Sequence, residues 1–270
     1  MEGGIHVSIK AEQLTQLMGV PITNTLLMSW VVVVVLAVLA LSVNRGIKLV
    51  PGKLQLILEM MVSGVLEFIE TTLESKALAR KYFPFITTIF LFIFTANMLE
   101  FIPGVGSIGI LAHQAFDAAN ATGATSTAMH AVATAEKSEF IPLLRSTNTD
   151  LNVTLALAII SFLTIEISGI VIVGFFKYFG RFFNFHSPIM FFVGLIEFVS
   201  ELIRLISFSF RLFGNIFAGE VLLAVATYFL PFVGPVPFMA FEVFVGFIQA
   251  AIFSLLTLFF LKLAVTETAH

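Results

Sequence analysis

Long apolar runs set the narrowest limit on what this chain can fold into. Residues 25–43 read TLLMSWVVVVVLAVLALSV, without one charged side chain, and later runs also exceed the roughly 18 apolar residues that a spanning helix needs. The composition agrees, because 59% of the 270 residues are hydrophobic, 11% are charged and the mean hydropathy is +1.04. Soluble domains carry about a quarter charged residues. The sequence therefore predicts an all-α integral membrane protein in contact with the lipid bilayer.

The composition also excludes several kinds of partner and site. The formal net charge of −3 suggests no nucleic-acid partner. The absence of cysteine excludes thiol catalysis and cysteine-ligated metals, and the five histidines are scattered without metal-ligand spacing. The phosphate-loop pattern G-x-x-x-x-G-K-S/T does not occur. We therefore expect no nucleotide site, metal or cofactor in this chain.

The apolar runs and their polar breaks predict the order of the elements. We expect about five membrane-crossing helices and one interfacial amphipathic helix, in a single membrane domain over residues 25–270 that follows an outer segment, residues 1–24. The elements are a first span over 25–43, an interfacial helix over 53–75, a second span over 83–103, an outer loop over 104–149, a third span over 153–176, and two long helices over 188–230 and 237–265.

The predicted interfacial helix carries an acidic stripe. Its polar residues recur at helical spacing, which suits a helix lying in the membrane surface better than one crossing it. This stripe either faces a protein partner or is a solvated face. Its residues are Glu59, Ser63, Glu67, Glu70 and Glu74.

The apolar region 188–230 is too long for one upright crossing. As a single helix it would be about 65 Å long, about twice the hydrocarbon thickness. It must therefore break or lie steeply tilted. The turn PFVGPVP, residues 231–237, then reverses the chain, so that the last two long helices form a hairpin.

Lysine and arginine residues predict the orientation. With five crossings and the N-terminus outside, most of these residues lie in inner loops, as positive charges in membrane proteins tend to do, and the C-terminus is cytoplasmic. The inner residues are Arg45, Lys48, Lys53, Lys76, Arg80, Lys81, Lys177, Arg181 and Lys262, and the outer ones are Lys10, Lys137 and Arg145.

Charged residues inside the first long helix are candidate functional residues. Glu197, Arg204 and Arg211 are spaced by seven and share one helix face, with Ser207 three residues after Arg204 and Asn215 four after Arg211. Arg211 falls near the middle of the predicted crossing, where a charge costs about 3 to 15 kcal/mol. Snorkelling to the head groups is a poor explanation for Arg211, because long apolar stretches flank it on both sides.

Further polar residues lie towards the predicted outer side. Glu220 is nine residues beyond Arg211, which turns it to roughly the opposite face and about 13 Å further along the axis. In the last helix Glu242 and Gln249 are seven apart and share a face. A hairpin about residues 231–237 would bring Glu220 and Glu242 to similar outer depth, and Arg211 and Gln249 to similar central depth.

These patterns leave more than one interpretation open. The two outer glutamates and Glu166, in the third span, could each be a neutral carboxyl that is hydrogen-bonded within the bundle. The residues near the cytoplasmic boundary could form an ordinary interfacial group of Glu197, Glu201 and Arg204. A structural anchor or a secondary transporter or ion channel are competing functions, although transporters usually contain inverted repeats and none is found.

The functional interpretation rests on two physical facts. Carboxyl groups in weakly polar surroundings exchange protons near neutral pH, whereas a guanidinium does not deprotonate. Glutamates in separate halves of the membrane with Arg211 between them would form two aqueous half-channels separated by a barrier. A proton would then need a moving carrier to pass Arg211.

Four segments resemble subunit a of F-type ATP synthases. They are RLFGNIFAGE (211–220), IQAAIF (248–253), DLNVTLALA (150–158) and NMLEFIPG (97–104), and the resemblance covers most of the chain from about Lys53 onwards. It implies a non-catalytic membrane stator whose two long, tilted helices lie against a rotating ring of c-subunits. The other partners it implies are the peripheral-stalk b subunits and, indirectly, the soluble ATPase head. The membrane would be a bacterial plasma (inner) membrane, with an organellar membrane as the alternative.

The resemblance also implies roles for single residues. Arg211 would be the essential arginine that attracts the ionised ring carboxylate and blocks a direct leak. Glu166 and Glu201 depart from the family pattern and are additional candidates only. The positions of the outer proton path are Glu220, Asn215, Glu242, Gln249 and Glu100, and those of the inner path are Glu197, Arg204 and Ser207.

Overall fold

The computed structural model describes most of the chain as helix. The described residues are 12–17, 20–46, 52–102, 105, 108–112, 139–180, 182, 188–231 and 233–266. The helices are α1 (Asn24–Gly46), α2 (Lys53–Leu73), α3 (Lys76–Leu99), α6 (Leu151–Val173), α7 (Phe175–Gly180), α8 (Pro188–Phe229) and α9 (Pro235–Thr266), with a 3₁₀ turn η1 (Thr147–Thr149). Two antiparallel pairs of short strands, β1 (Gln13–Leu17) with β2 (Val20–Thr23) and β3 (Gly109–Ala112) with β4 (Glu139–Pro142), complete the fold.

The helices confirm an all-α membrane protein. Within the described part, α1, α3, α6 and α9 are long and apolar enough to cross a bilayer. The remaining crossing predicted from the sequence corresponds to α8, which is not in that group. It is also the helix that carries Glu197, Glu201, Arg204, Arg211 and Glu220.

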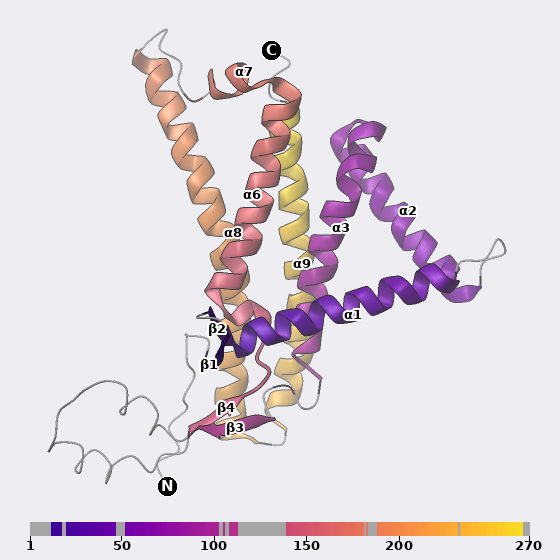
Figure 1. The fold of residues 1–270 in the computed structure, drawn as a ribbon, viewed down its shortest axis with the longest axis vertical. Helices are drawn as coiled ribbons and strands as arrows, with labels where there is room; N and C mark the ends of the chain where they lie inside the picture. Colours follow the sequence, from indigo (N-terminus) through magenta and orange to yellow (C-terminus); the bar gives the residue numbers. More distant parts are fainter. Residues whose placement is uncertain are drawn as a thin grey trace, which may run out of the picture.

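The structure settles whether the long apolar region breaks. α8 is one unbroken helix of 42 residues, about 63 Å long at 1.5 Å per residue. Since the hydrocarbon layer is about 30 Å thick, α8 must lie steeply tilted or project from it. α3, α6, α8 and α9 run alongside one another, while α1 crosses them obliquely (Figure 1). These four helices and α1 therefore cannot all stand along the same membrane normal.

α9 is the central helix of the bundle. It packs against α2, α3, α6 and α8, and Figure 1 shows it between α3 and α6. Two buried apolar clusters hold these helices together. One joins α2, α3, α6 and α9 through residues such as Ile69, Ile86 and Leu258. The other joins α3, α6, α8 and α9 through Ile93, Leu212 and Phe253, among others.

Some element boundaries differ from those expected. The predicted second span covers 83–103, whereas α3 begins at Lys76, where the Ser75 hydroxyl accepts a hydrogen bond from the Leu78 N–H, and ends at Leu99. The sequence placed the start later because basic residues precede the apolar run. The segment 1–24, expected to be on the outer side, contains the β1–β2 hairpin, which was not predicted, and its first eleven residues lie outside the described part.

The expected outer loop, residues 104–149, is not uniformly exposed. Residues 113–138 lie outside the described part, but residues 145–150, here called the polar segment, are all buried. Its Asn148 side chain donates to the Asn97 Oδ1 of α3 over 2.6 Å, and Asn97 in turn donates to the Gly246 carbonyl of α9 over 2.9 Å. Asp150 caps α6 by accepting from the Asn152 N–H. A chain of hydrogen bonds therefore joins this segment to the bundle.

Replacing Asp150 by alanine should lower the free energy of unfolding by about 1 to 3 kcal/mol. Its Oδ2 accepts a buried hydrogen bond of 2.9 Å from the Thr25 hydroxyl of α1, so the variant loses the α6 cap and leaves that hydroxyl without its acceptor. Thermal unfolding of the purified chain in detergent measures the effect. Asp150→Asn keeps a side-chain oxygen for the cap, so its free energy of unfolding should fall less than that of Asp150→Ala. An Asp150→Ala chain as stable as the parent would contradict this assignment.

Candidate functional site

A buried ion pair joins the polar segment to α8. Arg145 donates from Nη2 to Glu220 Oε2 over 2.8 Å and from Nε to Oε1 over 3.1 Å. The Arg145 side chain is only 8% exposed and that of Glu220 is 30% exposed. A two-point pairing of this kind fixes the orientation of a carboxylate as well as neutralising it. The carboxylate of Glu220 is therefore held in place by the loop that precedes α6.

Glu242 of α9 approaches α8 closely at Gly219. A methyl group added at Gly219 would overlap the Glu242 carboxylate, which would then have to move. Glu242 is 6% exposed, and neither of its carboxylate oxygens has a hydrogen-bond partner among the described residues. Its charge interacts with that of Glu220. The sequence had placed these two glutamates at similar depth from spacing alone, and the structure brings them together.

Glu100 joins this group from the end of α3, just beyond that membrane-spanning helix. Its Oε2 is fully buried and has no hydrogen-bond partner in the described part of the chain. Burial raises the pKa of Glu100 from 4.5 to about 8, helped by the negative charges of Glu242 and Glu220 and opposed by Ser146 and Arg145. We call Arg145, Glu220, Glu242 and Glu100 the Arg145 cluster.

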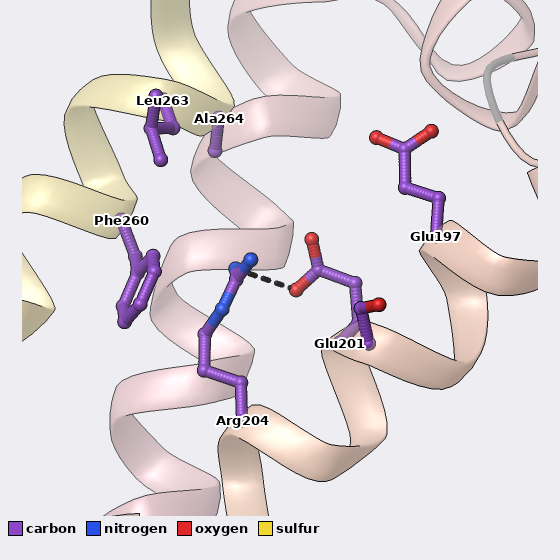
Figure 2. A pocket seen from close by; sticks show the side chains of 7 residues that line it. Glu197, Glu201, Arg204, Phe260, Leu263 and Ala264 are labelled. Atoms are coloured by element: carbon purple, nitrogen blue, oxygen red, sulfur yellow. Dashed lines mark hydrogen bonds and ion pairs between the residues drawn. The ribbon is translucent and has the colours of Figure 1, made fainter.

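A second charged group lies near the other end of α8. Glu201 Oε2 accepts a hydrogen bond of 2.7 Å from Arg204 Nη1, and the Arg204 guanidinium carbon lies 3.8 Å from the centre of the Phe260 ring of α9 (Figure 2). These side chains line a cavity of about 70 Å³, room for a few water molecules. We call Glu197, Glu201 and Arg204 the Arg204 cluster; Ser200, Phe260, Leu263 and Ala264 complete the lining.

Arg211 lies between the two clusters and faces outwards. Its side chain is exposed, its guanidinium carbon is 6.0 Å from the centre of the Phe208 ring, and no described residue forms an ion pair with it. Ser207, Gly214 and Ala218, which fall on the same helix face, are exposed as well. Small residues therefore lie on the same helix face as this guanidinium, beside exposed apolar side chains such as Phe210. This face leaves the charge accessible from outside the bundle.

The other expected site residues lie apart from both clusters. Asn215 is half-buried one turn after Arg211. Gln249 is buried on α9, and its Nε2 has no hydrogen-bond partner among the described residues. Glu166 accepts a hydrogen bond of 2.9 Å from the Tyr178 hydroxyl of α7 and is thus hydrogen-bonded within the chain.

Sequence reasoning missed one member of these clusters and kept another only as an additional candidate. Arg145 was counted only as a positive charge of an outer loop. Its position five residues before Asp150, the first residue of the DLNVTLALA segment, was the available signal. Glu201 was kept as an additional candidate, although its spacing of three residues from Arg204 already allowed a pair on one helix face.

Comparison with known protein families identifies the family of this chain. The model of the family described as ATP synthase A chain matches residues 26–262, a stretch that contains both clusters and Arg211. The chain belongs to the ATP synthase A chain family. This is the family of subunit a, a membrane subunit of the Fo sector. The chain is therefore a multi-pass membrane component of an ATP synthase and takes part in ATP synthesis and proton transport.

Curated relatives in this family are similar over nearly the whole chain. ATP synthase subunit a of Campylobacter concisus is 32% identical over 242 residues, 88% of this chain and 88% of that protein. The protein of the same name from Campylobacter curvus is 34% identical over 243 residues, 89% of this chain and 88% of its own length. ATP synthase subunit a 3 of Pelobacter propionicus is 30% identical over 244 residues, 90% of this chain and 87% of that protein.

Gly219→Ala should destabilise the chain by about 1 to 3 kcal/mol, because the added methyl group must displace the buried Glu242 carboxylate. Gly214→Ala is the matched control, since nothing lies within 4 Å of a side chain added there. It should be neutral or slightly stabilising, as alanine favours a helix over glycine by up to about 1 kcal/mol. Thermal unfolding in detergent compares the two variants. Equal losses would show that Gly219 is not in close contact with Glu242.

The raised pKa of Glu100 predicts how stability depends on pH. Between about pH 4.5 and 8 the folded chain keeps this carboxyl protonated while the unfolded chain has released the proton. The contribution of Glu100 to stability is therefore fully present below pH 4.5 and is lost as the pH rises through about 8. Melting temperatures of the parent and of Glu100→Gln, measured against pH, test this. Between about pH 4.5 and 8 the melting temperature should fall less steeply in Glu100→Gln than in the parent. Parallel curves for the two chains would contradict the raised pKa of Glu100.

Proposed function

We propose that this chain is the stator subunit of a rotary F-type ATP synthase, in which two proton half-channels load and unload the carboxylates of a c-ring. The observation that carries the proposal is the state of Arg211. Glu201, Arg204 and Glu220 of the same helix each pair with another side chain, whereas Arg211 is exposed without an ion-pair partner among the described residues.

A guanidinium at membrane depth that has no ion-pair partner in the described part of the chain calls for a partner from outside. A charge in the hydrocarbon region is expensive unless an opposite charge or water meets it. Small residues around Arg211 would let another helix approach closely, as small residues commonly do between membrane helices. A carboxylate on a neighbouring c-subunit has the charge and the reach that such a surface needs. The exposed face of α8 is thus the proposed contact with the ring.

The two clusters suit the two half-channels. The Arg145 cluster would belong to the outer path, together with Asn215 and Gln249. The Arg204 cluster with its small cavity would belong to the inner path, together with Ser207. Between Arg204 and Glu220 lie about 24 Å of helix at 1.5 Å per residue, and Arg211 falls within this interval. Protons in either path would meet the fixed positive charge of Arg211 before reaching the other path.

Vectorial transport follows from this separation. A proton from the outer path neutralises one ring carboxylate, the ring turns that neutral carboxyl into the lipid, and a carboxyl arriving on the inner side releases its proton there. Each proton gains about 2.3 kcal/mol per 100 mV of membrane potential, so several protons must pass for each ATP made. Glu220, Glu242 and Glu100 would be groups of the outer path, and Glu197 one of the inner path.

The other partners and the orientation follow from the same assignment. The c-ring would lie against α8 and α9, the peripheral-stalk b subunits would hold the chain against rotation, and the soluble ATPase head would be coupled indirectly. We place the N-terminus outside and the C-terminus in the cytoplasm of a bacterial plasma (inner) membrane, in agreement with the distribution of Lys and Arg.

Arg211→Ala should abolish ATP synthesis in vesicles that contain the whole complex, and should allow passive proton flux, because nothing then separates the two paths. ATP synthesis and the decay of an imposed pH gradient are the two measurements. Arg80→Ala is the matched control, since Arg80 is an exposed arginine at the far end of α3. An Arg211→Ala complex that still makes ATP at the parental rate would contradict the stator proposal and favour a transporter or channel.

A further inference from the structure

Arg145 occupies a position that no role assigned so far explains. It lies outside the long helices, in the polar segment, yet it is almost completely buried and gives two hydrogen bonds to Glu220. The polar segment is held at two points beyond Arg145, since Asn148, within η1, is bonded to α3 and Asp150, directly after η1, to α1. The guanidinium is thus presented to α8 in a preorganised position, at little further cost in conformational freedom.

The three carboxyl groups around Arg145 are not equivalent. Both oxygens of Glu220 are held by Arg145, whereas both oxygens of Glu242 and Oε2 of Glu100 have no hydrogen-bond partner in the described chain. Glu242 packs against Gly219, next to Glu220 in the sequence, and the charges of Glu220 and Arg145 act on Glu100. A carboxylate with unoccupied oxygens can take up a proton without first breaking an ion pair, and a carboxylate clamped by a guanidinium cannot.

We infer that Arg145 is a positioning residue of the outer proton path: it clamps Glu220 as a fixed anion and leaves proton exchange to Glu242 and Glu100. This inference rests on the proposed function. Each exchanging carboxylate takes one proton from water of the outer side and passes the same proton on, so it returns to its ionised form. Glu220 keeps its charge throughout and, with Arg145, sets the proton affinity of the two neighbours.

The inference predicts opposite effects for the two partners of the pair. Removing the positive charge of Arg145 makes Glu242 and Glu100 hold protons more tightly, whereas removing the negative charge of Glu220 makes them release protons more easily. The charged groups that face this pair are Glu242 from α9 and Glu100 from the end of α3. A purely structural clamp would reduce the rate in both variants without moving the pH dependence in opposite directions.

The test uses the whole ATP synthase in proteoliposomes. ATP synthesis is measured while the pH of the outer compartment varies at constant total driving force. Arg145→Gln should raise the pH of half-maximal rate by about one unit, and Glu220→Gln should lower it by a similar amount. Arg145→Lys keeps the charge but not the two-point geometry, so it should keep the parental pH dependence at a reduced rate. Arg80→Gln is the control and should leave rate and pH dependence unchanged.

The possible results separate this inference from the proposed function. If Arg211→Ala stops synthesis while the Arg145 and Glu220 variants leave the half-maximal pH unchanged or move it in the same direction, the inference fails and the stator proposal stands. If synthesis tolerates Arg211→Ala as well, the proposed function fails. Should Arg145→Gln not assemble, Glu220→Gln decides alone. If Glu220→Gln lowers the pH of half-maximal rate and the complex still makes ATP, the clamp is supported. If the assembled Glu220→Gln complex makes no ATP, Glu220 is itself a proton carrier and the inference is overturned.

Discussion

Polar groups placed between membrane helices must find their partners inside the protein, because lipid offers none. The polar segment, residues 145–150, meets this requirement by bonding to three different helices. Its Asn148 reaches α3, its Asp150 reaches α1 and its Arg145 reaches α8. Each bond satisfies a buried group that would otherwise cost free energy, and together they help to fix the relative positions of three helices. The arrangement of carboxyl groups around Arg145 depends on this segment more than on any single helix.

The continuity of α8 has a similar consequence for the separation of charges. An unbroken helix keeps the Arg145 cluster and the Arg204 cluster at fixed distances from Arg211. Within each cluster the positive charge is paired inside the chain, through Glu220 in one case and Glu201 in the other. The arginine of each cluster therefore has its counter-ion inside the chain. Arg211 differs, because it is exposed and has no ion-pair partner among the described residues.

Sequence reasoning worked where the controlling interactions are local. Apolar length identified the membrane helices, and helical spacing together with the turn at 231–237 placed Glu220 near Glu242. It did not find the partner of Arg145, which is 75 residues away in the sequence. Nor did it show that Gly219 makes room for Glu242, since that contact depends on how closely α8 and α9 approach. The two strand pairs were missed because their strands are short and carry little apolar alternation.

The free charge of Arg211 also links the stability of this chain to its assembly. Left without a partner, the guanidinium must draw water or lipid head groups to α8 or remain poorly solvated, and either alternative raises the free energy of the isolated chain in a membrane. A partner that supplies a carboxylate removes this cost and stabilises the chain by mass action. Because the carboxylate must leave again when a ring turns, the pairing has to be reversible. An exposed arginine meets this condition better than a buried one, since no packed side chains have to move when its partner leaves.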